Sequence, residues 1–162
     1  MPKVLFVDNN PQQRMLYQEI ALDHGWDGVV VAEASEFIDS VRATAPDVIV
    51  TEWNLEPVGT RRIAEALRED PELGRIPIIV VTAQMEYAVV PGLGLVRPEL
   101  VLYKPAHVAD MVAGVELLAA CDRSIQMALP STVIGSLDSF APPHFPRAAP
   151  HIINASLRAC AA

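Results

Sequence analysis

Short, wholly apolar runs, each followed by a segment with helical spacing, are the feature that most constrains the fold of this chain. The runs are rich in Val, Ile and Leu and occupy residues 4–7, 29–31, 48–50, 78–81 and 100–103. Apolar residues at helical spacing occur within residues 11–23, 34–44, 60–69 and 107–120. Strands that alternate with helices are typical of βαβ units, and strands without polar alternation are buried on both faces. The sequence therefore predicts an α/β fold, with a doubly wound, five-stranded parallel sheet.

The interval between the fourth and fifth predicted strands does not follow this pattern. Residues 85–98 contain Pro91, Gly92, Gly94 and Pro98. Relative to alanine, each proline inside a helix costs about 3 kcal/mol and each glycine about 1 kcal/mol. We therefore expect a turn near residues 84–90 followed by irregular chain, so that the helix between these two strands is degraded or missing.

The character of the chain changes near its C-terminal end. A length of 162 residues fits one domain with an appended segment. We assign residues 1–122 to the domain and residues 123–162 to an extension rich in Pro and Ala. Residues 152–160 have the spacing of a short amphipathic helix, and the extension is expected to be partly disordered or docked on the domain.

Composition excludes several classes of function. The formal net charge of −8 argues against DNA as a partner, because phosphate backbones are bound by clustered Lys and Arg. The two cysteines, Cys121 and Cys160, form no CxxC or Cys/His cluster, which excludes a disulfide framework and a zinc site and suits a reducing compartment. No apolar run approaches the roughly 20 residues that span a bilayer, so no membrane role and a cytoplasmic location are expected.

Polar residues stand where the predicted strands end. Asp8, Glu52, Thr82 and Lys104 each follow or close an apolar run. The carboxyl ends of parallel strands meet at one edge of an open sheet, and ligands bind there because loop amides and helix N-termini converge at that edge. These four residues are therefore the candidate functional site.

Four motifs resemble those of a known family. They are residues 5–9 (LFVDN), 46–55 (PDVIVTEWNL), 77–83 (PIIVVTA) and 103–105 (YKP). In this order and spacing they resemble the receiver domain of bacterial response regulators over residues 3–120. The resemblance implies a flavodoxin-like sheet and a role in two-component signal transduction, where an Asp accepts a phosphoryl group from a histidine kinase.

The resemblance also implies roles for individual residues. In the family, two adjacent acids, the phosphoacceptor Asp and a nearby backbone carbonyl hold Mg²⁺, while a Thr hydroxyl and a Lys ammonium receive the phosphoryl oxygens. By position, Asp8 corresponds to the first acid and Asn54 to the carbonyl donor. Thr82 and Lys104 correspond to the phosphoryl-sensing pair.

Two positions depart from the family. Asn9 replaces the second acid, and Glu52 stands in place of the phosphoacceptor Asp. The charge of the acidic pocket falls from about −3 to about −2, which weakens binding of the Mg²⁺ that Asp8, Glu52 and Asn54 would hold. Glu52 also moves its carboxylate outward by about 1.5 Å, one carbon–carbon bond, and a misplacement of about 1 Å can cost 10²-fold in a positioned reaction. Phosphoryl transfer to Glu52 is not expected.

We interpret the chain as an atypical single receiver domain, a pseudo-receiver without catalytic activity or a required cofactor. It would act as a phosphorylation-independent signalling and protein-interaction module. The Glu52 carboxylate could bond Lys104 and Thr82 and imitate the phosphorylated state, or it could form an ion pair with Lys104 that serves structure alone.

Two other functions stay open at this point. The first is a working phosphoacceptor in a phosphorelay. The second is a small nucleotide-binding protein, although no Gly-rich loop follows the first strand. The expected partner is a signalling protein or a second copy of the chain, bound through residues 85–98, the fifth strand and the last helix.

Overall fold

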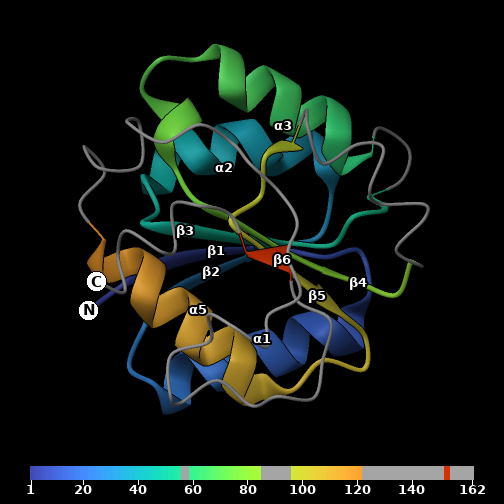
Figure 1. The fold of residues 1–162 in the computed structure, drawn as a ribbon, viewed down its shortest axis with the longest axis vertical. Helices are drawn as coiled ribbons and strands as arrows, with labels where there is room; N and C mark the ends of the chain where they lie inside the picture. Colours follow the sequence, from blue (N-terminus) through green and yellow to red (C-terminus); the bar gives the residue numbers. More distant parts are fainter. Residues whose placement is uncertain (56–58, 85–95, 122–151, 154–162) are drawn as a thin grey trace.

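The computed structural model describes residues 1–55, 59–84, 96–121 and 152–153. Its centre is one sheet with the strand order β2-β1-β3-β4-β5-β6 (Figure 1). The strands are β1 (Lys3–Val7), β2 (Asp27–Val31), β3 (Val48–Thr51), β4 (Ile78–Thr82), β5 (Leu100–Tyr103) and β6 (Ile152–Ile153). The first five are parallel, and β6 runs antiparallel to β5. The predicted flavodoxin-like, five-stranded parallel sheet is confirmed.

Helices cover both faces of the sheet. α1 (Pro11–Asp23) and α5 (Val108–Ala120) lie on one face, while α2 (Phe37–Thr44) and α3 (Thr60–Glu69) lie on the other (Figure 1). Short 3₁₀ turns, Ala34–Glu36 and Leu73–Arg75, precede α2 and β4. No helix in this described part of the chain is long and apolar enough to cross a bilayer.

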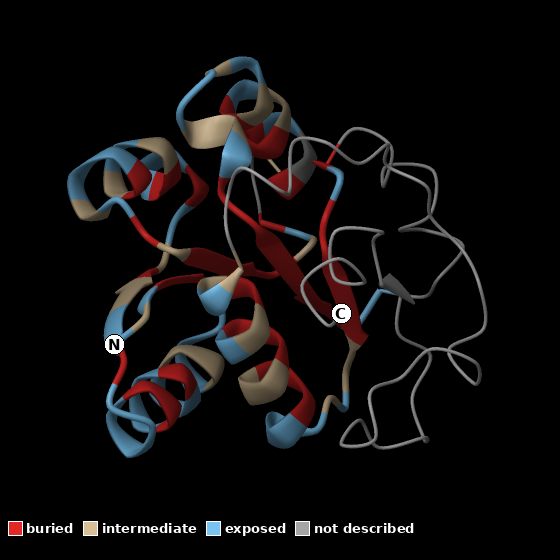
Figure 2. Ribbon diagram, turned by 60° about the vertical axis from the view of Figure 1, so that its left-hand side comes forward, coloured by how far each residue is buried: buried red, intermediate tan, exposed pale blue. Residues whose placement is uncertain are grey.

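Two apolar layers form the core, and alternate strand residues divide between them. Leu5, Ile49 and Val101 belong to the layer beneath α2 and α3. Phe6, Val50 and Leu100 belong to the layer beneath α1 and α5. Since neighbouring residues of a strand point to opposite faces, both faces of β1, β3, β4 and β5 are buried (Figure 2). This is why the sequence shows continuous apolar runs in place of alternation.

The loop that follows β1 is fixed by the start of α1. The side-chain oxygen of Asn10 accepts hydrogen bonds from the backbone N–H groups of Gln12 (2.9 Å) and Gln13 (3.4 Å), and Pro11 occupies the first turn. Gly25 ends the helix region with a left-handed φ of 65°. A capped start holds α1, and with it the loop from Asp8 to Asn10, in one position.

A buried arginine joins α3 to the chain that leads into β5. The guanidinium of Arg68 donates hydrogen bonds to four backbone carbonyls, those of Gly74, Ile76, Val96 and Arg97. It also lies 3.7 Å from the carboxylate of Glu99, which in turn accepts a hydrogen bond from the Ile78 amide at 2.6 Å. Burial raises the pKa of Glu99 and lowers that of Arg68. The pair therefore fixes the entry to β5 at the expense of burying two charges.

Some expectations fall outside the described residues or need correction. The helix expected to be degraded would lie within residues 85–98, of which residues 85–95 are not described. Val96, which follows them, has helical conformation. The second strand begins at Asp27, two residues before the apolar run. The short helix predicted over residues 152–160 is wrong at its start, because Ile152 and Ile153 form β6. Pairing with β5 supplies backbone hydrogen bonds that an isolated short helix would have to make alone.

The expectation of reduced cysteines is also wrong. Cys121, the residue that follows α5, is engaged in a disulfide. The other cysteine of the chain, Cys160, lies outside the described residues. Sequence spacing gave no indication of this bond, because disulfide partners meet in space and their separation along the chain is free.

We predict that Arg68→Met lowers the free energy of unfolding by about 3–5 kcal/mol, because it leaves the buried Glu99 carboxylate without its cation. Urea denaturation at pH 7 measures the loss. Arg42→Met is the matched control: Arg42 pairs with Asp70 at 3.9 Å on the surface, and its side chain is 61% exposed. The control should lose no more than about 1 kcal/mol. Equal losses in the two variants would contradict this account of the Arg68–Glu99 pair.

Candidate functional site

The candidate residues meet at the carboxyl edge of the sheet. Val7 is in register with Thr51, so the residues that follow them, Asp8 and Glu52, leave the sheet side by side. The backbone continues the pairing one step further: the Glu52 N–H donates to the Val7 carbonyl at 3.0 Å. Lys104 follows β5 and its N–H donates to the Thr82 carbonyl at 2.7 Å. Parallel register thus brings together residues that are far apart in the sequence.

Lys104 holds the two carboxylates. Its Nζ lies 2.8 Å from Glu52 Oε2 and 3.2 Å from Asp8 Oδ2, and it donates a hydrogen bond to each. Asp8 and Glu52 are both buried, whereas the Lys104 side chain is 21% exposed. One ammonium between two carboxylates leaves a formal charge of about −1 at this edge, and charge-assisted hydrogen bonds of this kind are the stronger ones.

Backbone amides take the remaining carboxylate oxygens. Asp8 Oδ1 accepts from the Asn10 N–H at 2.8 Å. Glu52 Oε1 accepts from the Trp53 N–H at 2.7 Å and, more weakly, from the Asn54 N–H at 3.4 Å. All four carboxylate oxygens therefore have donors within the protein, which satisfies the polar groups that burial would otherwise leave unpaired.

The electrostatics of the site favour a charged Lys104. Burial by itself would lower the pKa of Lys104. The hydrogen bond and charge of Glu52, followed by those of Asp8, outweigh burial and raise the pKa above its ordinary value. The ammonium is therefore stabilised in the folded state.

The structure places Asn9 and Asn54 at the exposed rim. Both residues are exposed. Arg14 Nη1 donates to the backbone carbonyls of Asp8 and Asn9, at 2.9 Å each, and so holds the loop between β1 and α1 closed. The sequence did not identify Arg14 as a residue of the site, because a long side chain that bonds loop carbonyls produces no periodic sequence pattern.

Thr82 is not joined to the carboxylates. It is fully buried at the end of β4, and its Oγ1 accepts a hydrogen bond from the Gln84 N–H at 3.1 Å. Within the described residues, the Glu52 carboxylate makes no hydrogen bond to Thr82. The hydroxyls that do contact Glu52 are those of Thr60 and Thr51, and both donate to the Glu52 backbone carbonyl. Thr60, at the start of α3, was not predicted as a site residue.

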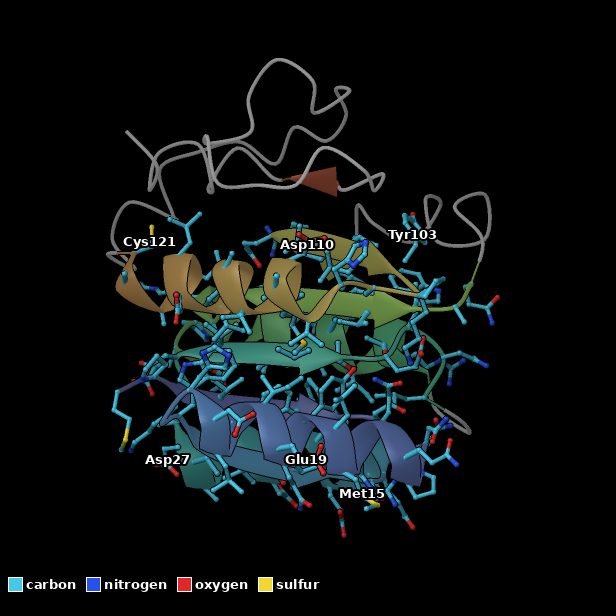
Figure 3. All side chains as sticks on the ribbon, turned by 90° about the horizontal axis from the view of Figure 1, so that it is seen from below. Met15, Glu19, Asp27, Tyr103, Asp110 and Cys121 are labelled. Carbon is cyan, nitrogen blue, oxygen red and sulfur yellow. The ribbon has the colours of Figure 1, made fainter. Side chains whose placement is uncertain are left out.

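Tyr17 is a second residue that the sequence did not identify. It is buried on the inner face of α1, and its ring stacks on Phe6 with a centroid distance of 4.9 Å. Burial raises the pKa of Tyr17, and the negative charges of Asp8 and Glu52 raise it further. The phenol therefore lies within electrostatic reach of the site, whereas Met15, on the outer face of the same helix, points to solvent (Figure 3).

The donor set bears on metal binding. Mg²⁺ prefers carboxylate and carbonyl oxygens with strict octahedral geometry. Across residues 1–55, 59–84, 96–121 and 152–153, no three His, Cys, Asp or Glu side chains converge as a metal site. The two carboxylates that do meet, from Asp8 and Glu52, already share the Lys104 ammonium. These residues fit a magnesium ion poorly.

We predict that Lys104→Met lowers the free energy of unfolding at pH 7 by about 2–4 kcal/mol, because two buried carboxylates lose their common cation. Urea denaturation measures this change. In a Glu52→Gln background the same substitution should cost less, since a single carboxylate then stays unpaired. Identical costs in the two backgrounds would show that Glu52 and Lys104 are not coupled.

The raised pKa of Lys104 predicts how stability changes with pH. A lysine whose folded-state pKa exceeds its unfolded value contributes stability below the unfolded pKa, near 10.4, and that contribution is lost as pH rises through the folded pKa. The slope from one such group is at most about 1.4 kcal/mol per pH unit. Tyr17, whose pKa is also raised, acts in the same direction above about pH 10.

Unfolding free energies measured from pH 8 to pH 11.5 should therefore fall at the alkaline end. The fall should be shallower in Lys104→Met and in Tyr17→Phe than in the unaltered protein. Lys3→Met, which removes an exposed ammonium, is the control and should leave the slope unchanged. An unchanged slope in both test variants would contradict the assignment.

Known proteins share this sequence pattern. The family model of the response regulator receiver domain matches residues 4–116. The polar-differentiation response regulator DivK of Brucella anthropi is 31% identical over 84 residues, which are 51% of this chain and 68% of DivK. The hybrid signal transduction histidine kinase D of Dictyostelium discoideum is 32% identical over 85 residues, which are 52% of this chain and 5% of that kinase. The match thus covers about two thirds of DivK and a small part of the kinase.

Solved structures share the fold. A putative response regulator from Chloroflexus aurantiacus superimposes with a TM-score of 0.67 at 20% identity, covering 74% of this chain and 99% of that chain. The chemotaxis response regulator CheY4 of Vibrio cholerae gives a TM-score of 0.66 at 20% identity, covering 73% of this chain and 98% of that one. With the family match over most of the domain, the chain belongs to the response regulator receiver domain family of two-component signal transduction.

Proposed function

We propose that this chain is an atypical, single-domain response regulator, a pseudo-receiver in which Glu52 stands in place of the phosphoacceptor Asp. It acts as a phosphorylation-independent signalling and protein-interaction module and not as an enzyme. The observation that carries the proposal is the Glu52 carboxylate, held by Lys104 at 2.8 Å on one oxygen and by the Trp53 amide at 2.7 Å on the other.

The geometry of Glu52 disfavours phosphoryl transfer. An attacking carboxylate oxygen must reach phosphorus in line, and its position must be accurate to well under 1 Å. Glutamate extends the carboxylate by one methylene, about 1.5 Å, beyond the reach of aspartate. Both of its oxygens also already accept hydrogen bonds, one of them from a cation. Attack would require breaking these bonds.

The surroundings do not supply the charge that the transfer needs. Phosphoryl transfer depends on a divalent cation to offset the charge of the transferring group. We propose that Asp8, Glu52 and the Asn54 carbonyl hold Mg²⁺ weakly or not at all, because Asn9 brings no carboxylate and Lys104 is already paired with both acids. No cofactor is required by this proposal.

We propose that the Glu52–Lys104 bond holds one fixed surface at the carboxyl edge of the sheet. In the family, Lys104 and Thr82 are the positions that receive phosphoryl oxygens. The contact between Glu52 and Lys104 supports a partial imitation of the phosphorylated state. The imitation does not include Thr82, whose hydroxyl oxygen bonds the Gln84 amide and not Glu52. If this bond serves structure alone, the module still presents a single surface that phosphorylation does not change.

The partner that we propose is another signalling protein or a second copy of the chain. The surface would comprise residues 85–98, β5 and α5, of which residues 85–95 are not described. A net charge of −8 does not favour DNA. A cytoplasmic location stays a prediction, and the disulfide of Cys121 does not favour it, because cytosolic thiols are kept reduced.

The alternative function is a working phosphoacceptor in a two-component phosphorelay. It is supported by the membership of the family and by Asp8, Thr82 and Lys104, which occupy the family's positions. This alternative requires that Glu52 release Lys104 and that the site bind Mg²⁺.

Intact-protein mass after incubation with a small-molecule phosphodonor and Mg²⁺ separates the two functions. We expect no phosphoryl group on the unaltered chain and one phosphoryl group on Glu52→Asp/Asn9→Asp, which restores both carboxylates of the family pattern. Glu52→Asp/Asp8→Asn is the matched control and should stay unlabelled. Mg²⁺-dependent labelling of the unaltered chain would reject the pseudo-receiver and support the phosphorelay.

A further inference from the structure

The outer edge of β5 faces away from the parallel sheet. β5 is the last strand of the parallel order, next to β4 on one side. The Lys104 N–H, directly after β5, donates to the Thr82 carbonyl of β4 at 2.7 Å, and the register between the two strands is constant along β5. Since backbone groups of successive strand residues point to opposite sides, the N–H and C=O of Leu100 and Leu102 point to β4, and those of Val101 point away from it. Such an edge is a template for another strand.

β6 occupies part of this edge. Ile153 is in register with Leu100 and Ile152 with Val101, in antiparallel orientation. Figure 3 shows β6 on the outer side of β5. The register pairs two residues, whereas β5 has four. The C-terminal segment thus adds a short strand of its own to a longer edge.

Contacts on both sides hold β5 in place. Gly114 allows α5 to lie close to β5: a Cβ at Gly114 would be 2.7 Å from Leu100 Cδ2. On the other side, Arg68 and Glu99 fix the residues that lead into β5. A preformed edge loses little conformational entropy when a strand is added, which favours binding.

We propose that the outer edge of β5 is a docking site for an extended, apolar peptide strand of a partner protein, and that Ile152–Ile153 is a built-in competitor for this edge. The inference rests on the proposed function as a protein-interaction module. The partner strand pairs antiparallel with β5 and displaces β6. Autoinhibition of this kind lets the C-terminal extension control access to the domain.

The chemistry of the partner strand follows from the two faces of β5. Leu100 belongs to the apolar layer beneath α1 and α5, and Val101 to the layer beneath α2 and α3. Residues that lie directly opposite one another on neighbouring strands share a face. A partner strand with consecutive apolar residues would therefore extend both apolar layers. The sequence of Ile152–Ile153 is of this kind. A strand with polar alternation would place a polar residue against one layer.

β6 can be displaced from β5 because only two of its residues pair with that strand. A strand usually spans about 5–6 residues, so β6 makes few of the backbone hydrogen bonds that a full strand would make. Its advantage is the covalent link to the domain, which gives it a high effective concentration. The apparent dissociation constant of a partner strand equals its intrinsic value divided by the fraction of molecules with an open edge.

The test compares the unaltered chain with Ile152→Pro, which removes the backbone donor at the position paired with Val101. Ala161→Pro, in the same C-terminal extension, is the matched control. The probe is a fluorescent peptide of residues 149–156, and the measurement is its anisotropy on titration. We expect binding to Ile152→Pro at least tenfold tighter than to the unaltered chain and to Ala161→Pro. The same peptide carrying proline at position 152 should not bind.

Hydrogen exchange gives the second readout. In Ile152→Pro, the Val101 amide should exchange at least tenfold faster than in the unaltered chain. The Leu100 amide, which points to β4, should be unchanged. Equal peptide affinities in all three proteins, no peptide binding to Ile152→Pro, or unchanged exchange at Val101 would each overturn the proposal. If the unaltered chain forms a stable dimer in light scattering and Ile152→Pro abolishes that dimer, exchange of β6 between two copies replaces the intramolecular competitor.

These outcomes are independent of phosphorylation. If the phosphodonor labels the unaltered chain while the peptide results hold, the proposed function fails and the β5 edge remains a docking site. If the chain stays unlabelled and the peptide results fail, the pseudo-receiver stands without this docking edge.

Discussion

Burial of the sheet on both faces is the constraint on which the rest of this structure depends. With α1 and α5 on one side and α2 and α3 on the other, the inner strands have no solvent-facing side for polar residues. Polar side chains are therefore confined to the strand ends. Parallel order puts those ends at one edge, and Asp8, Glu52 and Lys104 meet there because β1, β3 and β5 end together.

The gathering of charged side chains at this edge explains the electrostatics of the site. Two buried carboxylates would repel each other, and each would need donors to replace water. Lys104 supplies the charge, and the amides of Asn10 and Trp53 supply the remaining donors. The outcome is a closed network in which the carboxylate of Glu52 is fully engaged. Such a network suits a fixed surface better than a nucleophile, which is the physical content of the pseudo-receiver proposal.

The second pair of buried charges has a different role. Arg68 and Glu99 lie at the opposite end of the strands from the acidic site, where residues 96–99 enter β5. Together with Gly114, which lets α5 pack closely on Leu100, they hold β5 in place. The edge that β6 pairs with therefore depends on contacts that only the folded chain makes.

The sequence by itself determined the parallel sheet and its edge. Uninterrupted apolar runs require burial on both faces, and Asp8, Glu52, Thr82 and Lys104 stand at the run ends. Of these four side chains, the structure joins Asp8, Glu52 and Lys104. Tertiary structure alone decided the rest. Thr82 bonds the Gln84 amide and not Glu52, Tyr17 turns inward to the charges, and Ile152–Ile153 forms a strand where helical spacing had predicted a helix. Arg68, Thr60 and the disulfide of Cys121 were likewise unforeseen. The bond between Thr82 and Gln84 is local, but a turn of this kind leaves no periodic pattern. Tyr17, Arg68 and Ile152–Ile153 depend on partners that are distant in the chain, and local periodicity carries no information about which distant groups will meet.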